Sequence, residues 1–125
     1  MNDNLILNVD DNEGARYSKT RVLVQAGFRV EEAANGKDAL SMIDSLRPTL
    51  VLLDVKLPDI SGLDVCREIR QRSHARDIRV VQISAALVSP EDKERGLQSG
   101  ADEYITVPFE PRDLVAQVRT LLNPQ

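Results

Sequence analysis

The stretch LVLLDVKLPDISGLDVCREIR, residues 50–70, contains a short apolar run, a polar loop and a helical pattern in that order. The run at 50–53 is continuous rather than alternating, which is typical of a parallel strand buried on both faces. Asp54 follows this run directly. Three apolar residues share one face of the helical segment after Gly62, namely Leu63, Cys66 and Ile69. The stretch therefore predicts a strand, a loop and a helix, with an aspartate where the strand ends.

The same alternation extends over the whole chain. Four further apolar runs lie at residues 5–9, 28–30, 80–83 and 104–107. Helical patterns fill the gaps at about 13–26, from 35–36 onward, at 90–99 and from Pro111. Strands that alternate with helices are connected by right-handed crossovers. The order predicts an α/β fold, a doubly wound (βα)5 sandwich around a parallel five-stranded sheet.

Length and composition favour one cytoplasmic domain. The 125 residues suit a single domain over 1–125, either a complete protein or a fragment of a longer one. Cys66 is the single cysteine, so no internal disulfide can form, which fits a reducing compartment. No apolar run approaches the about 20 residues of a membrane helix, and the acidic N-terminus MNDNLILNVDD is unlike a signal peptide. We expect no membrane partner.

The charge pattern argues against a nucleic-acid partner. The net charge is −4, and the arginines between 67 and 79 are scattered among acids. A DNA-binding domain usually carries a basic patch. With two Tyr, two Phe and no Trp, the chain also lacks the residues of a base-stacking platform.

Acidic residues follow two of the predicted strands. Asp10 and Asp11 follow the first strand, and Asp54 follows the third. In a doubly wound sheet these strands are neighbours, so the three carboxylates meet at one edge, where they repel one another unless a cation binds. Oxygen-only ligands open to water suit Mg²⁺. Zinc is disfavoured, because His74 and Cys66 stand alone.

These residues suggest phosphoryl chemistry. A carboxylate beside Mg²⁺ can attack phosphorus, which makes Asp54 the candidate nucleophile. Ser84 ends the fourth strand and can donate a hydrogen bond to a phosphoryl oxygen, and the small Ala85 and Ala86 leave space. Taken singly, Asp11 and Ser84 could be helix caps, and Asp54 a turn residue. Their common place at the ends of adjacent strands favours a shared site.

The chain resembles the receiver domains of two-component response regulators over residues 4–122. The matching stretches are LILNVDDNE at 5–13, AANGKDAL at 33–40, LVLLDVKLPDISGLDVCREIR at 50–70, VVQISA at 80–85 and GADEYITVPFEPRDL at 100–114. The resemblance implies a flavodoxin-like sheet of order 2-1-3-4-5. It implies a signalling protein rather than an enzyme, with only self-phosphorylation and self-dephosphorylation chemistry.

The resemblance also implies roles for particular residues. Asp54 is the expected phosphoacceptor, and Asp10 and Asp11 are expected to hold Mg²⁺ together with Asp54 and the main-chain carbonyl of Lys56. Ser84 is expected to bind the phosphoryl group, and Tyr104 to be the aromatic of the switch. The implied donor is a histidine kinase or a histidine phosphotransfer domain. A homodimer through the fourth helix, fifth strand and fifth helix is a further expectation.

One departure from the family lies after the fifth strand. The sequence reads Val107-Pro108-Phe109 where the family normally has Lys-Pro-Phe, and the Lys contacts the phosphoryl group. Loss of such a charged hydrogen bond costs on the order of 1.5–3 kcal/mol. One hypothesis is that Lys56 partly compensates. We also predict that the Val107–Pro108 bond is cis.

Two other functions compete with phosphotransfer. The first is a phosphorylation-independent interaction module on the same fold, which the missing Lys favours. The second is an enzyme of similar topology, either a flavin carrier or a phosphatase. The acidic loop at 10–13 would repel a flavin phosphate in the absence of metal, and the short chain fits a capped phosphatase poorly.

Overall fold

The computed structural model describes residues 4–72, 77–84 and 89–123, and its centre is one parallel sheet. The strands lie in the order β2-β1-β3-β4-β5, so the predicted fold and strand order are confirmed. The strands are β1 (Leu5–Val9), β2 (Arg29–Ala33), β3 (Leu50–Asp54), β4 (Arg79–Ser84) and β5 (Glu103–Thr106).

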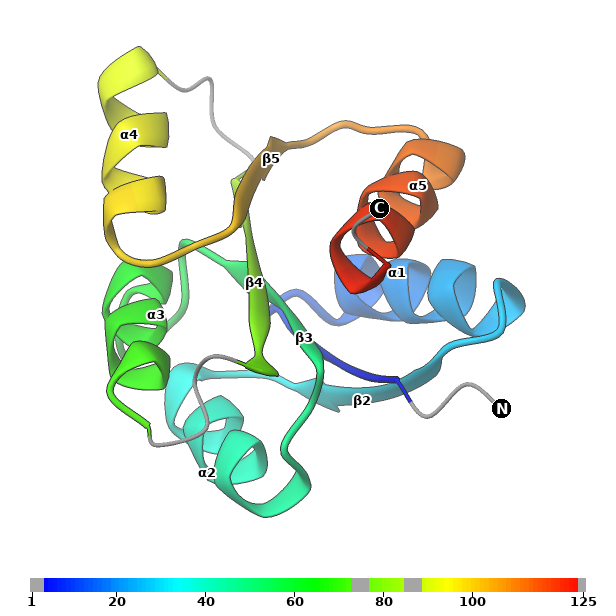
Figure 1. Cartoon of the computed structure of the whole chain (residues 1–125), viewed down its shortest axis with the longest axis horizontal. Coiled ribbons are helices and arrows are strands. Elements are labelled where there is room, and N and C mark those ends of the chain that lie inside the picture. Colours follow the sequence, from blue (N-terminus) through cyan, green and yellow to red (C-terminus); the bar gives the residue numbers. More distant parts are fainter. Residues whose placement is uncertain (1–3, 73–76, 85–88, 124–125) are drawn as a thin grey trace.

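Helices cover both faces of the sheet. They are α1 (Glu13–Gln25), α2 (Gly36–Leu46), α3 (Gly62–Arg70), α4 (Pro90–Gln98) and α5 (Pro111–Leu122). Figure 1 shows α1 and α5 on one face, and α2, α3 and α4 on the other. Each crossover thus returns the chain to the same end of the sheet.

Two hydrophobic clusters fill the space between the layers. In β3, Leu50 and Leu52 belong to the cluster with α1 and α5, whereas Val51 and Leu53 belong to the cluster with α2 and α3. All four side chains are fully buried. Burial on both faces explains why the run at 50–53 is apolar without alternation.

The strand at the edge of the sheet differs most from its predicted bounds. β2 runs from Arg29 to Ala33, whereas the apolar run predicted residues 28–30. It pairs with β1 alone, and Glu31 is exposed. An edge strand tolerates polar residues, which hides it from a search for apolar runs. Phe28 precedes β2 and is buried in the core.

Capping side chains fix the starts of four helices. Asn12, Asn35, Ser61 and Ser89 each accept a hydrogen bond from the main-chain N–H three residues on. Such caps satisfy donors that have no partner within the helix. The predicted cis bond at Val107–Pro108 is confirmed.

Candidate functional site

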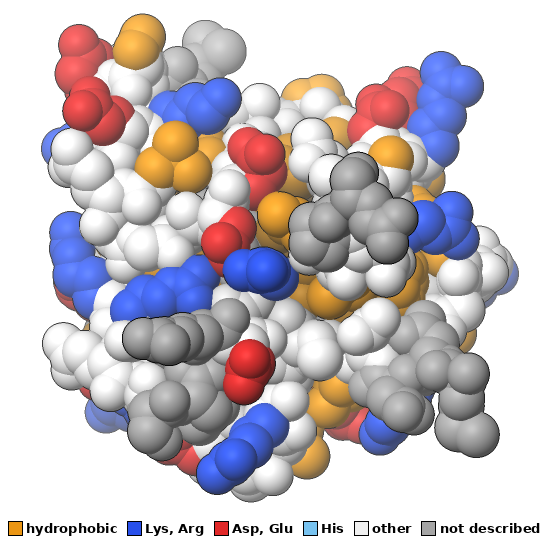
Figure 2. Space-filling model, in the orientation of Figure 1, with side chains coloured by type: hydrophobic (Ala, Val, Ile, Leu, Met, Phe, Trp, Pro, Cys, Tyr) orange, Lys and Arg blue, Asp and Glu red, His pale blue; other side chains and the backbone are white. Residues whose placement is uncertain are grey.

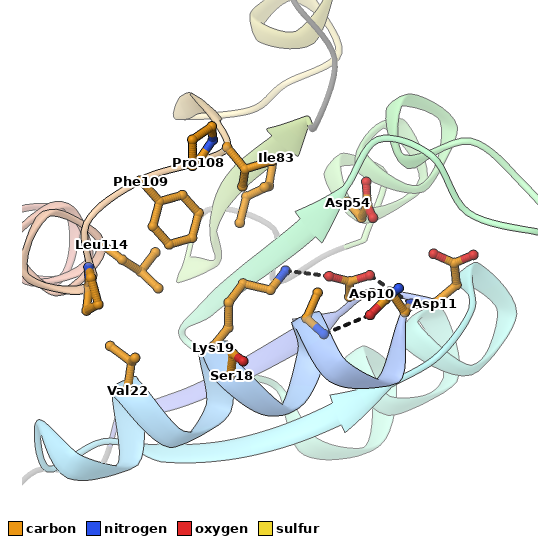
Figure 3. A pocket seen from close by; sticks show the side chains of 14 residues that line it. Asp10, Asp11, Ser18, Lys19, Val22, Asp54, Ile83, Pro108, Phe109 and Leu114 are labelled. Atoms are coloured by element: carbon orange, nitrogen blue, oxygen red, sulfur yellow. Dashed lines mark hydrogen bonds and ion pairs between the residues drawn. The ribbon is translucent and has the colours of Figure 1, made fainter.

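Three carboxylates meet beyond the carboxyl ends of β1 and β3. Val9 pairs with Leu53, so Asp10 and Asp11 emerge next to Asp54. One oxygen from each lies within 4.8 Å of the others. The structure therefore brings together the three acids that the sequence predicted to converge, as Figure 3 shows.

Asp10 is the most buried of the three, with 4% of its surface exposed. Its Oδ1 accepts a hydrogen bond from the main-chain N–H of Asn12 at 2.9 Å. Its Oδ2 lies 2.9 Å from Nζ of Lys19. Both oxygens of Asp10 are therefore engaged by the protein itself.

Lys19 is a site residue that the sequence analysis missed. It lies in α1, where Lys19 and Leu23, four residues apart, are the buried side chains. The sequence of α1 has a thin apolar stripe through Ala15, Val22 and Leu23, and Lys19 falls four residues after Ala15 on that stripe. A lysine on the core-facing side of a helix was the signal that could have identified it.

Asp54 lies half-buried at the end of β3. Its Oδ1 accepts a hydrogen bond from the main-chain N–H of Lys56 at 3.1 Å. Burial raises the pKa of the Asp54 carboxyl, and the charges of Asp10 and Asp11 raise this pKa further, against the Lys56 N–H and the charge of Lys19. The ionised carboxylate is thus destabilised, so a cation would bind favourably beside it.

The loop after β3 is held tightly at both ends. Gly62 donates its N–H to the carbonyl of Val55 at 2.7 Å, and a Cβ at Gly62 would lie 2.2 Å from the carbonyl oxygen of Asp54. Asp59 accepts hydrogen bonds from the main-chain N–H groups of Gly36 and Lys37. These bonds lower the pKa of Asp59 to about 2. The backbone around Asp54 is therefore fixed by contacts with α2 and α3.

Ser84 and Tyr104 lie on the neighbouring strands. Ser84 ends β4 and lines a cavity of about 830 Å³ together with Asp11, Asp54 and the exposed Lys56. The Tyr104 ring is buried, and a Cβ at Gly96 would lie 2.3 Å from its Cδ2. Ser84 therefore faces the same cavity as Asp54, and the aromatic ring packs against α4. Ala85, Ala86 and His74 lie outside the described residues.

A second cavity of about 450 Å³ lies between α1 and the β5–α5 connection. The charged side chains of Asp10, Lys19 and Asp54 line it together with apolar residues, which include Val22, Val107, Pro108, Phe109 and Leu114. Figure 3 shows the Lys19 side chain extending from α1 toward Asp10, with Phe109 and Leu114 across from it. Because Val107 is uncharged, the side of the cavity formed by Val107, Pro108 and Phe109 carries no charge.

Tyr17 and Cys66 lie away from the acidic site. Tyr17 is 58% exposed and accepts a hydrogen bond from Arg21, as expected for a surface residue. Cys66 lies in α3 and is buried in the core, and burial raises the pKa of its thiol. Neither residue contributes to the acidic site.

Comparisons with known proteins identify the family. The family model of the response regulator receiver domain matches residues 6–119. The DNA-binding response regulator MtrA of Mycolicibacterium paratuberculosis is 43% identical over 118 residues, which are 94% of this chain and 51% of MtrA. The chain belongs to the response regulator receiver domain family, the signalling module of two-component systems.

Solved structures agree with this family. A CheY-like receiver domain protein from Methanospirillum hungatei superimposes with a TM-score of 0.89 at 30% identity, covering 97% of this chain and 94% of that chain. The chemotaxis protein CheY4 of Vibrio cholerae superimposes with a TM-score of 0.88 at 28% identity, covering 94% of this chain and 98% of that one.

The chain spans about half the length of the curated relatives it matches. MtrA is named a DNA-binding regulator, so the absence of a nucleic-acid partner stays a prediction for this chain. On the face shown in Figure 2, acidic and basic side chains are interspersed. None of the helices in the described part of the chain has the length and apolar content that crossing a bilayer requires.

Proposed function

We propose that Asp54 accepts a phosphoryl group from a phosphohistidine on a histidine kinase or a histidine phosphotransfer domain. An oxygen of Asp54 forms a bond to phosphorus while the phosphorus–nitrogen bond of the donor breaks, and the electron pair of that bond stays on the imidazole nitrogen. The supporting observation is the group of three carboxylates within 4.8 Å at the end of β3. Asp54 lines both the cavity of about 450 Å³ and that of about 830 Å³.

The acidic residues fit Mg²⁺. Every candidate ligand is an oxygen, as a hard cation prefers. Asp11 is exposed and Asp54 is half-buried, so both can offer an oxygen. Asp10 contacts Lys19 and Asn12, but each carboxylate oxygen can accept more than one bond, so Asp10 is the third proposed ligand. The main-chain carbonyl of Lys56 is the fourth proposed ligand. When bound, Mg²⁺ offsets negative charge on the transferring group.

Ser84 and Tyr104 are proposed to report the modification to the surface. Phosphorylation gives Asp54 three acceptor oxygens and more negative charge. The Ser84 hydroxyl can donate to one of these oxygens, since both residues line the same cavity. Tyr104 packs between the sheet and Gly96 of α4, so a shift at the end of β4 alters the face formed by α4, β5 and α5. A homodimer through this face is the proposed output. Phosphorylation shifts the balance between two pre-existing arrangements of Ser84 and Tyr104.

One experiment tests the phosphoacceptor directly. The protein is incubated with Mg²⁺ and acetyl phosphate, and its intact mass is measured. We expect the wild type to gain one phosphoryl group and Asp54→Asn to gain none. Asp64→Asn is the matched control, because Asp64 is an exposed partner of Arg67 outside the site. A phosphoryl group on Asp54→Asn would contradict the assignment.

A second function is favoured by Val107. An interaction module that never becomes phosphorylated would have no need for a lysine after β5. Under this alternative the wild type gains no mass with acetyl phosphate and Mg²⁺, yet still binds its partner. The acidic neighbours of Asp54 and its raised pKa favour phosphorylation instead. Both indicate that a bound cation would stabilise the ionised carboxylates.

A further inference from the structure

We infer that the ammonium group of Lys19 enters the site from α1 and supplies the positive charge that Val107 lacks, by contacting the phosphoryl group on Asp54. The inference rests on the proposed phosphorylation of Asp54. The proposed contact transfers no proton, because Lys19 only donates hydrogen bonds to the phosphoryl oxygens.

The place of Lys19 is costly for a purely structural residue. Its side chain is 7% exposed, whereas lysines are almost never fully buried unless they are paired. A buried ion pair adds little net stability, because desolvation offsets the attraction between the charges. An apolar residue at this position would extend the stripe that includes Leu23. A function at the site explains why a charge occupies the core-facing side of α1.

Lys19 lies within reach of the phosphoryl group. Its Nζ is 2.9 Å from Oδ2 of Asp10, and an oxygen of Asp10 is within 4.8 Å of one on Asp54. An ammonium has three N–H donors, of which the Asp10 contact takes one. The flexible stem of lysine lets the group turn without leaving Asp10. A phosphoryl oxygen on Asp54 can therefore accept a second hydrogen bond from Lys19.

Val107 and Lys19 lie on the same cavity. Both line the space of about 450 Å³ that also reaches Asp54. Val107 packs against the same apolar cluster as Phe109, while Lys19 extends from α1 toward Asp10. The cation thus enters from α1 instead of from the residue after β5.

Lys56 fits this role less well. Its side chain is exposed, and it lines the other cavity with Asp11 and Ser84. Its hydrogen bond to Asp54 comes from the main-chain N–H. A solvent-exposed charge is screened by water and salt, whereas a buried one is screened much less. The buried Lys19 is therefore the stronger partner for a phosphoryl group.

The test moves the charge from α1 to the residue after β5. The variants are Lys19→Met, Val107→Lys and both together, with Lys37→Met as the matched control at an exposed lysine. Folding is checked by circular dichroism. Affinity for beryllofluoride, a phosphoryl mimic, is measured with Mg²⁺ by fluorine NMR, and the phosphorylation rate with acetyl phosphate by intact mass.

We expect Lys19→Met to weaken beryllofluoride binding by about tenfold or more, which corresponds to about 1.4 kcal/mol. Val107→Lys should change it by less than about threefold while Lys19 is present, and should restore about tenfold in the Lys19→Met background, since the two positions supply the same charge. The Lys37→Met control should bind as the wild type does.

Two results would overturn the inference. One is a folded Lys19→Met protein that binds beryllofluoride and becomes phosphorylated like the wild type, which would leave Lys19 as a structural partner of Asp10. The other is a gain of about tenfold or more from Val107→Lys alone, which would mean that the wild-type site lacks this cation. The second result decides the matter even if Lys19→Met does not fold. A wild type that neither binds beryllofluoride nor gains mass would instead refute the proposed phosphorylation of Asp54.

Discussion

Nζ of Lys19 lies 2.9 Å from Oδ2 of Asp10, and both side chains are more than nine-tenths buried. The pair joins α1 to the end of β1. Removing one partner of a buried pair leaves the other charge without compensation. The pair therefore couples the stability of the fold to the charge of the site.

Lys19→Met should lower the free energy of unfolding by about 3–5 kcal/mol without Mg²⁺, because the buried Asp10 loses its charged partner. The same change makes the site more negative, so Mg²⁺ should bind more tightly than to the wild type. Urea denaturation with and without Mg²⁺ measures both effects. Asp10→Asn with Lys19→Met removes both charges and should recover part of the loss. Weaker Mg²⁺ binding by folded Lys19→Met would contradict this prediction.

Asp54→Asn should stabilise the metal-free protein at neutral pH. Burial raises the pKa of Asp54, with Asp10 and Asp11 adding to the effect. Protonation of Asp54 therefore favours the folded state, and the penalty sets in as the pH rises through the raised pKa. Thermal unfolding should show a higher Tm for Asp54→Asn at pH 7, with a difference that closes as the pH is lowered through that pKa.

Mg²⁺ should make the wild type more stable than Asp54→Asn, which reverses their order without metal. At a concentration of 100 times its Kd, a ligand stabilises the folded state by about 2.7 kcal/mol. The wild type should gain this stability, and Asp54→Asn should gain much less because it lacks a charged ligand. Since protons compete with the metal for Asp54, the gain should decrease at acid pH. An equal gain in both proteins would place the metal elsewhere.

The sheet and the acidic site could be predicted from the sequence for one physical reason. Strands buried on both faces need continuous apolar runs, as at 50–53, and the ends of adjacent parallel strands meet at one edge. Asp10, Asp11 and Asp54 follow such runs, so their convergence required no knowledge of side-chain packing. β2 was placed less well, because an edge strand needs fewer apolar residues.

Lys19 could not be assigned in this way. A lysine within a helix usually extends into solvent. The apolar stripe of α1 can be recognised without position 19, so the sequence does not draw attention to Lys19. Its role depends on which neighbours α1 has across the cavity, namely Asp10 and Val107. That arrangement is set by the packing of α1 beside α5. The sequence shows Val107 where the family has a lysine, and the structure shows that Lys19 of α1 lies near the same acidic site.

Gly62→Ala should disrupt the site through the backbone. A Cβ at Gly62 would lie 2.2 Å from the carbonyl oxygen of Asp54 and 2.8 Å from Cα of Val55. Both contacts are with main-chain atoms, which cannot rotate away as a side chain can. We expect a loss of about 1–3 kcal/mol in the free energy of unfolding and weaker Mg²⁺ binding. Gly14→Ala is the control, because its nearest contact would be 3.5 Å. Equal stability of the two variants would contradict the prediction.

Asp59→Asn should change how stability depends on acid. Hydrogen bonds from Gly36 and Lys37 lower the pKa of Asp59 from 3.8 to about 2. The ionised carboxylate therefore stabilises the fold above about pH 4, and this contribution is lost as the pH falls toward 2. Urea denaturation should show Asp59→Asn less stable than the wild type at neutral pH, with a gap that narrows over this range. A gap independent of pH would show that the charge of Asp59 does not contribute.

Gly96→Ala should displace the ring of Tyr104. A Cβ at Gly96 would lie 2.3 Å from Cδ2 and 2.6 Å from Cε2 of Tyr104, so the ring has to leave its place against α4. Lost packing of the ring opposes the gain of about 1 kcal/mol that alanine brings to a helix.

Fluorotyrosine labelling gives two fluorine NMR signals, one from Tyr104 and one from Tyr17, which is already 58% exposed. Only the Tyr104 signal should move toward the position of an exposed tyrosine. Phosphorylation of Asp54 should persist in the intact-mass assay, because Gly96 lies outside both cavities that Asp54 lines. An unmoved Tyr104 signal would mean that α4 shifts instead of the ring, and that the proposed link from Tyr104 to the face of α4, β5 and α5 is wrong.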